Sequence, residues 1–412
     1  MQDSGYEVGY TIGNSRSDYF SFVMSPDSGI MKWEYVNIEI NGEIILGRIE
    51  DLISKSDLLT DHLDYNSIRR YTDTGINDAV DVCEVRILGI PADGGIKRSR
   101  YLIRPGIPVK RATKEILEKL FRVDDEKALN IGYLTDNPDI EVSADIDGLR
   151  RHLAIIAQTG AGKSHTAGVI MEEILKKGGS IVVIDPHADY VLMKNSSNPL
   201  YKERIKIFRT PLSTGRYMDR LGKVTDFTIR FQDLNPDEVS EIMGIKENYT
   251  NLSKIVRDSF EKMSAARDVD EFINRAEKVD SEGKISARIK YLKRIRQIFG
   301  PRSTDVSEFL APSQLSVIDL SGLDQSLANY FAYRVISQSY DMKTSSAFEY
   351  PVFIFIEEAH NFVPAAKNKP GGVSGLVFDQ IRKIASEGRK FGIFLAVITQ
   401  RPGKIDQDVL SQ

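Results

Sequence analysis

The 412-residue sequence predicts an α/β protein whose main part is a mostly parallel sheet with helices on both faces, preceded by a small β-barrel. Three observations lead to this fold class. Short runs rich in β-branched and aromatic residues fill residues 1–110. From Leu149 onward, apolar strands alternate with amphipathic helices. A glycine-rich loop joins the first of these strands to a helix, a sequence of elements typical of phosphate-binding proteins.

Residues 1–110 are expected to form the barrel. The candidate strands are short and are separated by glycine, aspartate, asparagine and serine: 19–24, 35–40, 44–49 and 80–88. Asn41–Gly42 between two of them indicates a tight hairpin. Strands at this spacing predict a small barrel or a sandwich. Residues 112–121 have a helical pattern, and the acidic stretch after them leads us to expect a linker over residues 111–148.

The second part contains six candidate strands, at 152–157, 180–185, 227–231, 315–320, 352–356 and 392–399. Because they alternate with helices, they predict a parallel sheet. No strand pattern occurs between 236 and 300, where four apolar residues recur at helical spacing: Ile285, Ile289, Leu292 and Ile295. We therefore expect a core in two pieces, 149–235 and 301–412, interrupted by a helical insertion over 236–300.

The run AQTGAGKS, from Ala157 to Ser164, matches the phosphate-binding pattern G-x-x-x-x-G-K-[ST], except that alanine replaces the first glycine. Small residues let backbone N–H groups close around phosphates, and the helix N-terminus adds partial positive charge. Lys163 is expected to reach the β- and γ-phosphates of ATP, and the Ser164 hydroxyl to bind Mg²⁺. The alternative, a glycine-rich turn with a chance lysine, fits this strand–loop–helix setting poorly. The expected nucleotide-binding residues are Thr159, Gly160, Ala161, Gly162, Lys163, Ser164 and His165.

Two adjacent acids, Glu357 and Glu358, end the apolar strand 352–356. Buried carboxylates are costly unless they are paired or bind a metal. We expect Glu357 to hold the Mg²⁺ shell and Glu358 to polarise the attacking water as general base, which favours hydrolysis over transfer to a bound substrate. The alternative is a strand that runs into an acidic helix N-terminus.

Polar residues also end two other strands. Gln400 follows the strand 392–399 and is expected to contact the γ-phosphate, although an ordinary strand end is the alternative. Asp185 follows the strand 180–185 and either orders the site from beside the loop or belongs, with His187 and Asp189, to a simple turn.

Arg389 lies between the Glu358 strand and the Gln400 strand. We expect it to act as an arginine finger on the γ-phosphate of a neighbouring subunit, a contact that can be worth about 10³–10⁵ in rate. The alternative interpretation is that Arg389 is an ordinary surface arginine near a helix C-terminus. Arg151, just before the loop strand, is a second and weaker candidate for such a contact with the nucleotide.

Composition excludes several classes. The net charge of −4 argues against wholesale coating of nucleic acid but allows a local basic region. The single cysteine, Cys83, cannot form an internal disulfide, which fits a reducing cytoplasm. The N-terminus has no secretory signal pattern, and the apolar runs are too short to span a bilayer. The sequence also has neither an N-K-x-D nor an L-S-G-G-Q motif, which argues against a GTPase or a transporter-type ATPase.

The sequence resembles the HerA family, archaeal relatives of the FtsK DNA translocases, over nearly its full length. The resemblance is carried by RHLAIIAQTGAGKSHT, VVIDPHADY, FIEEAHNF and SEGRKFG followed by VITQRP, with GYEVGYTIG and the hairpin of residues 35–49 in the barrel. It implies a hexameric ring with a RecA-like motor and a barrel crown, ATP and Mg²⁺ between subunits, and double-stranded DNA in the pore. It also implies a NurA-type nuclease partner that docks on the barrel, a role in processing DNA ends for recombinational repair, and an archaeal cytoplasm. Family members usually continue beyond the Gln400 strand, so the resemblance implies further chain after Gln412.

A basic segment over residues 283–302 is the candidate DNA contact. It contains no acidic residue, and we single out Arg288, Lys290, Lys293 and Arg294 as candidates for contact with phosphates. The alternative is the solvated face of a helix, and no motif for reading bases is visible. Two other functions share the same ATPase core: a motor of a membrane-bound secretion or conjugation complex, and a non-translocating scaffold that loads a nuclease.

Overall fold

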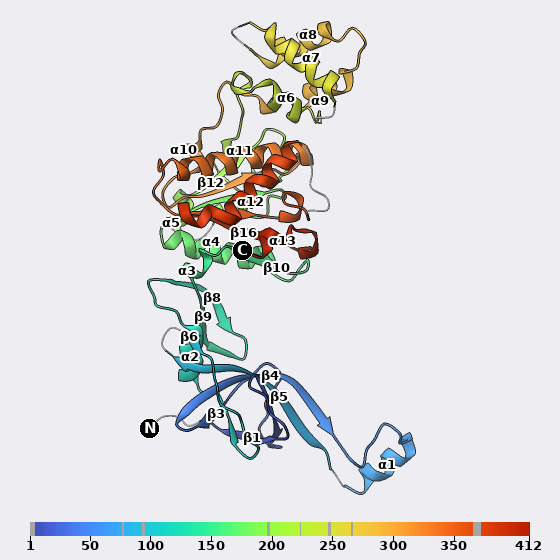
Figure 1. The fold of residues 1–412 in the computed structure, drawn as a ribbon, viewed down its shortest axis with the longest axis vertical. Helices are drawn as coiled ribbons and strands as arrows, with labels where there is room; N and C mark the ends of the chain where they lie inside the picture. The colour runs from blue at the N-terminus through green and yellow to red at the C-terminus, as the bar shows by residue number, and fades with distance from the viewer. Residues whose placement is uncertain are drawn as a thin grey trace. The chain divides into compact units, whose positions relative to one another are not determined.

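The computed structural model describes residues 5–75, 78–92, 95–195, 198–222, 224–245, 249–264, 267–365 and 372–412. The chain divides into two compact units, Met1–Asp145 and Ile146–Gln412, which we call the barrel unit and the motor unit (Figure 1). Among the described residues, no helix is both long and apolar enough to cross a bilayer.

The barrel unit is built on antiparallel strands in the order β2-β1-β7-β3-β4-β5-β6, and an additional pairing of β2 with β5 closes the barrel. The strands are β1 (Glu7–Ile12), β2 (Tyr19–Met24), β3 (Tyr35–Ile40), β4 (Glu43–Lys55), β5 (Val80–Ala92), β6 (Gly95–Lys97) and β7 (Pro108–Arg111). Closure decides between the two predicted arrangements in favour of the barrel. The predicted Asn41–Gly42 hairpin joins β3 to β4, and both residues have positive φ, as a type I′ turn requires.

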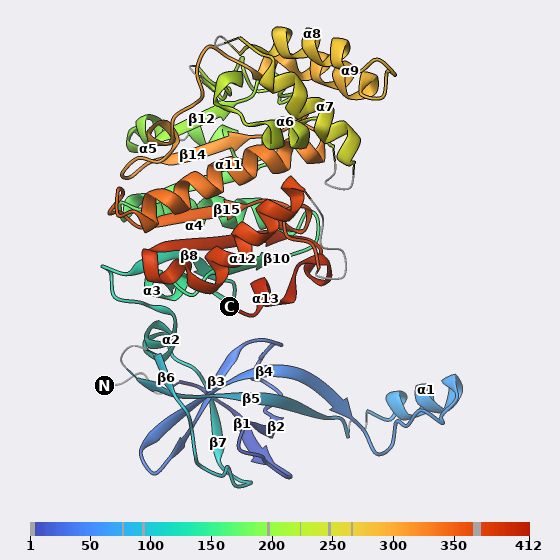
Figure 2. The same cartoon turned by 45° about the horizontal axis from the view of Figure 1, so that its top comes forward.

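Strands β4 and β5 continue past the barrel as a long ribbon, with helix α1 (Tyr65–Asp73) beyond its end (Figure 2). Asp64 caps α1 by accepting hydrogen bonds from the backbone N–H groups of Asn66 and Ser67. No residue of α1 is buried. The sequence patterns did not reveal this helix, because it packs on no core that would impose an apolar stripe.

The prediction of a linker over residues 111–148 was wrong. These residues form helix α2 (Lys114–Phe121) and a two-stranded sheet of β8 (Ala128–Leu134) and β9 (Asn137–Asp145). Leu117 of α2 and Ile140 of β9 are buried in one small apolar cluster. Most other side chains of β8 and β9 are partly or fully exposed, so the hairpin carries the polar composition that sequence reasoning assigns to linkers.

The motor unit contains a parallel sheet in the order β10-β16-β15-β11-β14-β12-β13. Its strands are β10 (Leu153–Ile156), β11 (Ser180–Asp185), β12 (Ile205–Arg209), β13 (Thr225–Asp226), β14 (Leu315–Asp319), β15 (Val352–Ile356) and β16 (Ile393–Thr399). Helix α4 (Lys163–Lys176) covers one face, and α11 (Gln325–Thr344) and α12 (Val373–Phe391) cover the other (Figures 1 and 2). Shorter helices are α3 (Ile146–Leu149), α5 (Pro199–Arg204), α10 (Val306–Phe309) and α13 (Gln407–Leu410).

The central strands of this sheet are buried on both faces, which explains why they read as continuous apolar runs. One predicted strand was misplaced. Residues 227–231 lie mostly outside the sheet, and the two-residue β13 precedes them. Strand β12 was missed because Lys206 and Arg209 interrupt its short apolar run.

Among the described residues between the two pieces of the motor core, four α-helices form: α6 (Pro236–Ile242), α7 (Thr250–Glu261), α8 (Val269–Val279) and α9 (Ser286–Ile295). The predicted stripe Ile285, Ile289, Leu292 and Ile295 is buried in the same apolar cluster as Phe260 of α7 and Phe272 of α8.

Candidate nucleotide-binding site

The glycine-rich loop connects β10 to α4, with Gly162 as the residue before the helix. Gly160 and Gly162 have φ values of 81° and 85°. This left-handed conformation costs other residues about 1–2 kcal/mol, so glycine is needed here for conformation. A Cβ atom added at either position would meet nothing within 4 Å, so the loop borders open space. The loop and the first turn of α4 therefore form a cradle for an anion.

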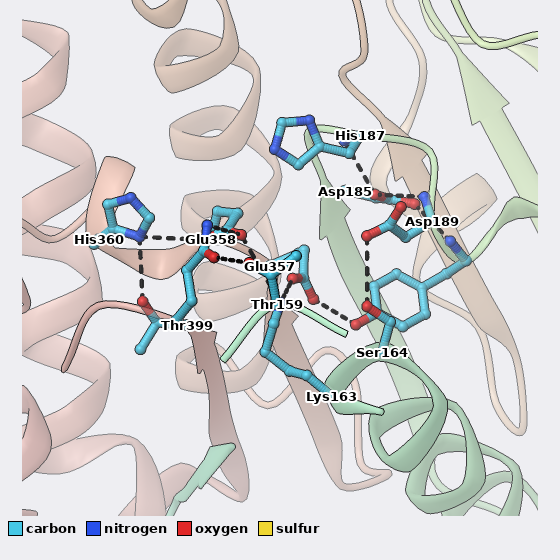
Figure 3. A network of polar contacts seen from close by, with 12 residues as sticks. Thr159, Lys163, Ser164, Asp185, His187, Asp189, Glu357, Glu358, His360 and Thr399 are labelled. Carbon is cyan, nitrogen blue, oxygen red and sulfur yellow. Dashed lines mark hydrogen bonds and ion pairs between the residues drawn. The ribbon is translucent and has the colours of Figure 1, made fainter. Parts of the chain in front are cut away.

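Lys163 begins α4, and its ammonium group points to the two acids at the end of β15 (Figure 3). Its Nζ donates a hydrogen bond to Glu357 Oε1 and lies 3.9 Å from Glu358 Oε1. The side chains are 10%, 1% and 11% exposed, respectively. The fold thus brings the predicted phosphate-binding lysine next to both predicted carboxylates. Lys163 and Glu357 are 194 residues apart in the sequence.

Tyr190 holds the other oxygen of Glu357. Its hydroxyl donates a hydrogen bond to Glu357 Oε2 from the turn after β11. Burial raises the pKa of Tyr190, and the charge of Glu357 raises it further, so the hydroxyl keeps its proton and remains a donor. Sequence reasoning missed this residue. The signal available was its place in DPHADY, five residues after Asp185.

Asp185 organises that turn. Its carboxylate accepts hydrogen bonds from the backbone N–H groups of His187, Asp189 and Tyr190. Burial raises the pKa of Asp185 to about 7. The turn places Asp189 Oδ2 3.5 Å from the Ser164 hydroxyl. Both arrangements weighed from the sequence are therefore present: Asp185 sits in a turn, and that turn lies beside the loop.

Glu358 is held in an unusual conformation, with φ of 48° for a residue that is not glycine. Its Oε1 accepts a hydrogen bond of 3.2 Å from Gln400 Nε2. Its Oε2 is buried and accepts no hydrogen bond of good geometry from any residue that the structure describes, and its polar neighbour is His360 Nδ1 at 3.2 Å. A buried carboxylate oxygen without a donor is a strong acceptor for an incoming O–H group.

His360 lies next to this oxygen, and Thr399 lies next to His360. His360 Nδ1 lies 3.2 Å from Glu358 Oε2 and 3.2 Å from Thr399 Oγ1. Burial lowers the pKa of His360, which favours the neutral ring. Sequence reasoning missed both residues, although each is near an acid or amide already singled out.

Gln400 connects the strand β16 to the loop as well as to Glu358. Its Oε1 accepts a hydrogen bond from the Thr159 hydroxyl. The Gln400 side chain therefore contacts both the phosphate-binding loop and the predicted general base. A group that senses the γ-phosphate needs such contacts.

The residues at this site fit ATP and Mg²⁺. The open cradle at Gly160 and Gly162, the N-terminus of α4 and the Lys163 ammonium are suited to phosphate oxygens. The Ser164 hydroxyl and the Glu357 carboxylate are hard oxygen donors of the kind that Mg²⁺ prefers. Thr159, Ala161 and His165 flank them, with the His165 side chain exposed on the first turn of α4.

Comparison with known protein families identifies the family of the chain. The model described as "Helicase HerA, central domain" matches residues 129–339. The chain belongs to the HerA family. A second model, "HAS barrel domain", matches residues 8–84 and agrees with the closed N-terminal barrel. The predicted fold class, a mostly parallel sheet with helices on both faces and a small β-barrel before it, is confirmed by the two sheets and their helices.

Curated HerA relatives are similar over most of their length. "Probable helicase MJ1565" of Methanocaldococcus jannaschii is 26% identical, with 100% of this chain and 80% of the relative covered. "DNA double-strand break repair helicase HerA" of Sulfurisphaera tokodaii is 27% identical, with 98% and 81% covered. Among solved structures, VirB4 of Thermoanaerobacter pseudethanolicus matches with a TM-score of 0.45 and 15% identity, covering 70% of this chain and 80% of that one.

Two predicted arginines lie away from the cradle in this HerA-family chain. Arg389 is exposed in the last turn of α12, and Arg151 is exposed just before β10. Both precede the first residue of a strand, so they lie at the amino-terminal edge of the sheet. The cradle and Glu358 follow strand ends, at the opposite edge. The topology therefore places the backbone of both arginines at the edge of the sheet opposite the nucleotide site of their own chain.

The predicted DNA-contact residues on α9 are partly neutralised within the HerA-family chain. Lys293 pairs with Glu277 at 2.6 Å, and the neighbouring Arg296 pairs with Asp270 at 3.0 Å. The Arg294 guanidinium stacks 5.1 Å above the centre of the Tyr291 ring. Arg288 lies against Gly244, and Lys290 is exposed.

Proposed function

We propose that this HerA-family protein hydrolyses ATP to drive a ring along double-stranded DNA during the repair of DNA ends. The observation that carries the proposal is the buried Oε2 of Glu358, which accepts no hydrogen bond of good geometry from the described residues and lies beside the Lys163–Glu357 pair at the phosphate cradle. The names of curated relatives, which include DNA double-strand break repair helicases, support the DNA substrate.

In the proposed mechanism, Lys163 moves its hydrogen bond from Glu357 to the β- and γ-phosphates when ATP binds. Ser164 and Glu357 would hold Mg²⁺, which would supply positive charge to neutralise the charge that develops on the phosphates. Tyr190 keeps Glu357 in place through its other oxygen. Glu358 Oε2 accepts a hydrogen bond from the attacking water and removes its proton.

Gln400 transmits the state of the nucleotide. Because it bonds both Thr159 and Glu358, loss of the γ-phosphate changes a contact that extends from the loop to β16. We propose that Arg389, exposed in the last turn of α12, acts on the γ-phosphate of a neighbouring subunit. Such a contact requires an assembly of subunits, for which we propose a homo-hexameric ring in the cytoplasm, with a NurA-type nuclease on the barrel.

The test is the ATPase rate of the full chain with and without linear duplex DNA over a salt series. We expect stimulation that weakens as salt rises, because phosphate contacts release counterions. Absence of stimulation at every salt concentration would refute the translocase. Stimulation without displacement of a protein block from the DNA would indicate a nuclease-loading scaffold instead.

A further inference from the structure

A short segment of the barrel unit carries positive charges that form no ion pair with any residue that the structure describes. It connects β6 to β7, and we call residues 98–104 the strap. Residues 95–114 contain no aspartate or glutamate. Arg98, Arg100 and Arg104 are exposed, and none forms an ion pair or side-chain hydrogen bond with any described residue.

The strap has no regular secondary structure, but buried and exposed side chains alternate along it, as in an extended chain. Ser99 and Ile103 are 8% and 1% exposed, and Ile103 joins the barrel core. Between them, Leu102 is 66% exposed and lies in the outward row with the three arginines. Alternate side chains of an extended chain lie about 7 Å apart on one face. The arginines therefore form a row rather than a scattered set.

Backbone contacts fix this row on the barrel. The Thr11 hydroxyl donates to the carbonyl oxygen of Arg104 at 2.7 Å, and the Ser15 hydroxyl donates to that of Ile103. Tyr101, on the inward row, engages Glu43, which raises the pKa of the tyrosine hydroxyl. The backbone of the strap is thus held on the barrel before any ligand binds.

We infer that the strap binds the sugar–phosphate backbone of duplex DNA. Exposed guanidinium groups without partners can form paired hydrogen bonds to phosphate oxygens, and they gain from release of counterions. The contrast with α9 supports this assignment, because Lys293 and Arg296 there already have carboxylate partners. The inference rests on the proposed function and adds a second DNA contact, in the barrel unit.

An acidic protein surface is the competing ligand, and the ribbon around α1 is the strongest candidate on a second copy. Three of its acids are engaged within the chain. Asp51 pairs with Lys32 at 3.1 Å, Asp64 caps α1, and Asp78 accepts hydrogen bonds from the backbone of Asp57 and Leu58. Asp57, Asp61 and Asp73 are exposed on the same ribbon, so the experiment measures assembly as well as DNA binding.

The experiment measures binding of the full chain to a labelled linear duplex without nucleotide, over a salt series. The variant replaces Arg98, Arg100 and Arg104 by alanine. Each lost phosphate contact should weaken binding roughly eightfold at 0.1 M salt and reduce the slope of log K against log salt by about 0.9. The corresponding triple lysine variant should retain most of the slope, because it keeps the charges.

The matched control replaces Lys55, Arg69 and Arg70. These substitutions remove the same amount of charge from the ribbon around α1, which belongs to the same unit. This control should bind DNA like the wild type. An unchanged salt slope in the arginine variant would overturn the inference. So would loss of assembly, measured by light scattering, with unchanged DNA affinity per chain, because the strap would then be a protein contact. ATP hydrolysis is measured separately, so a failed ATPase with strap-dependent DNA binding would refute only the proposed function.

Discussion

Replacing Tyr190 by phenylalanine tests how Glu357 is held. The ring is 2% exposed and the change removes one oxygen atom, so packing is kept and only the hydrogen bond to Glu357 Oε2 is lost. Hydrogen bonds to charged groups contribute about 1.5–3 kcal/mol, and we expect the motor unit to lose that much free energy of unfolding. For a unit of this size, the loss corresponds to roughly 3–10 °C in Tm.

The assay follows unfolding by far-UV circular dichroism, because most helices lie in the motor unit. Trp33, the single tryptophan, lies in the barrel unit, so its fluorescence reports the part that should not change. The matched control is Tyr201→Phe, since the buried Tyr201 hydroxyl makes no hydrogen bond of good geometry among the described residues. We also expect Tyr190→Phe to need more Mg²⁺ for half-maximal ATP hydrolysis. Equal stability and equal Mg²⁺ dependence in the two variants would refute the role of Tyr190.

Three further changes test the site and its surroundings. Glu358→Gln should still bind ATP but lose about 10²–10⁴ in turnover, and retained hydrolysis measured by phosphate release would show that the base is misassigned. Arg389→Ala mixed with Lys163→Ala should regain ATPase activity in mixed rings, because some interfaces then combine both wild-type residues; continued inactivity of rings shown to be mixed would count against the finger. Burial lowers the pKa of His152, so its folded form stays neutral while the unfolded chain binds a proton below about pH 6.5. The contribution of His152 to the free energy of unfolding is complete above that pH and is lost as the pH falls. The difference in this free energy between the wild type and His152→Asn, measured by urea titration, should therefore shrink between about pH 7.5 and 5.5. A constant difference would contradict this.

The sequence determined the chemistry that depends on local order. A loop that needs glycine at Gly160 and Gly162, followed by Lys163 at a helix start, is recognisable because backbone conformation and the helix terminus impose it. Apolar strands β11, β15 and β16 were located because burial on both faces requires continuous apolar runs. Glu357 and Glu358 stood out because charge at the end of such a run has a cost.

Only the tertiary structure decided which distant groups meet. Tyr190 contacts Glu357 because β11 and β15 are neighbours in the sheet, and no local pattern encodes that pairing. The hairpin β8–β9 was mistaken for a linker because its exposed face needs no apolar residues. The predicted DNA contact is a further example. Basic residues in the sequence pointed to α9, but Lys293 there is paired with Glu277, whereas the arginines of the strap have no partner among the described residues. The sequence shows where charged residues and apolar runs occur. The tertiary structure determines which charges have partners and which apolar side chains are buried.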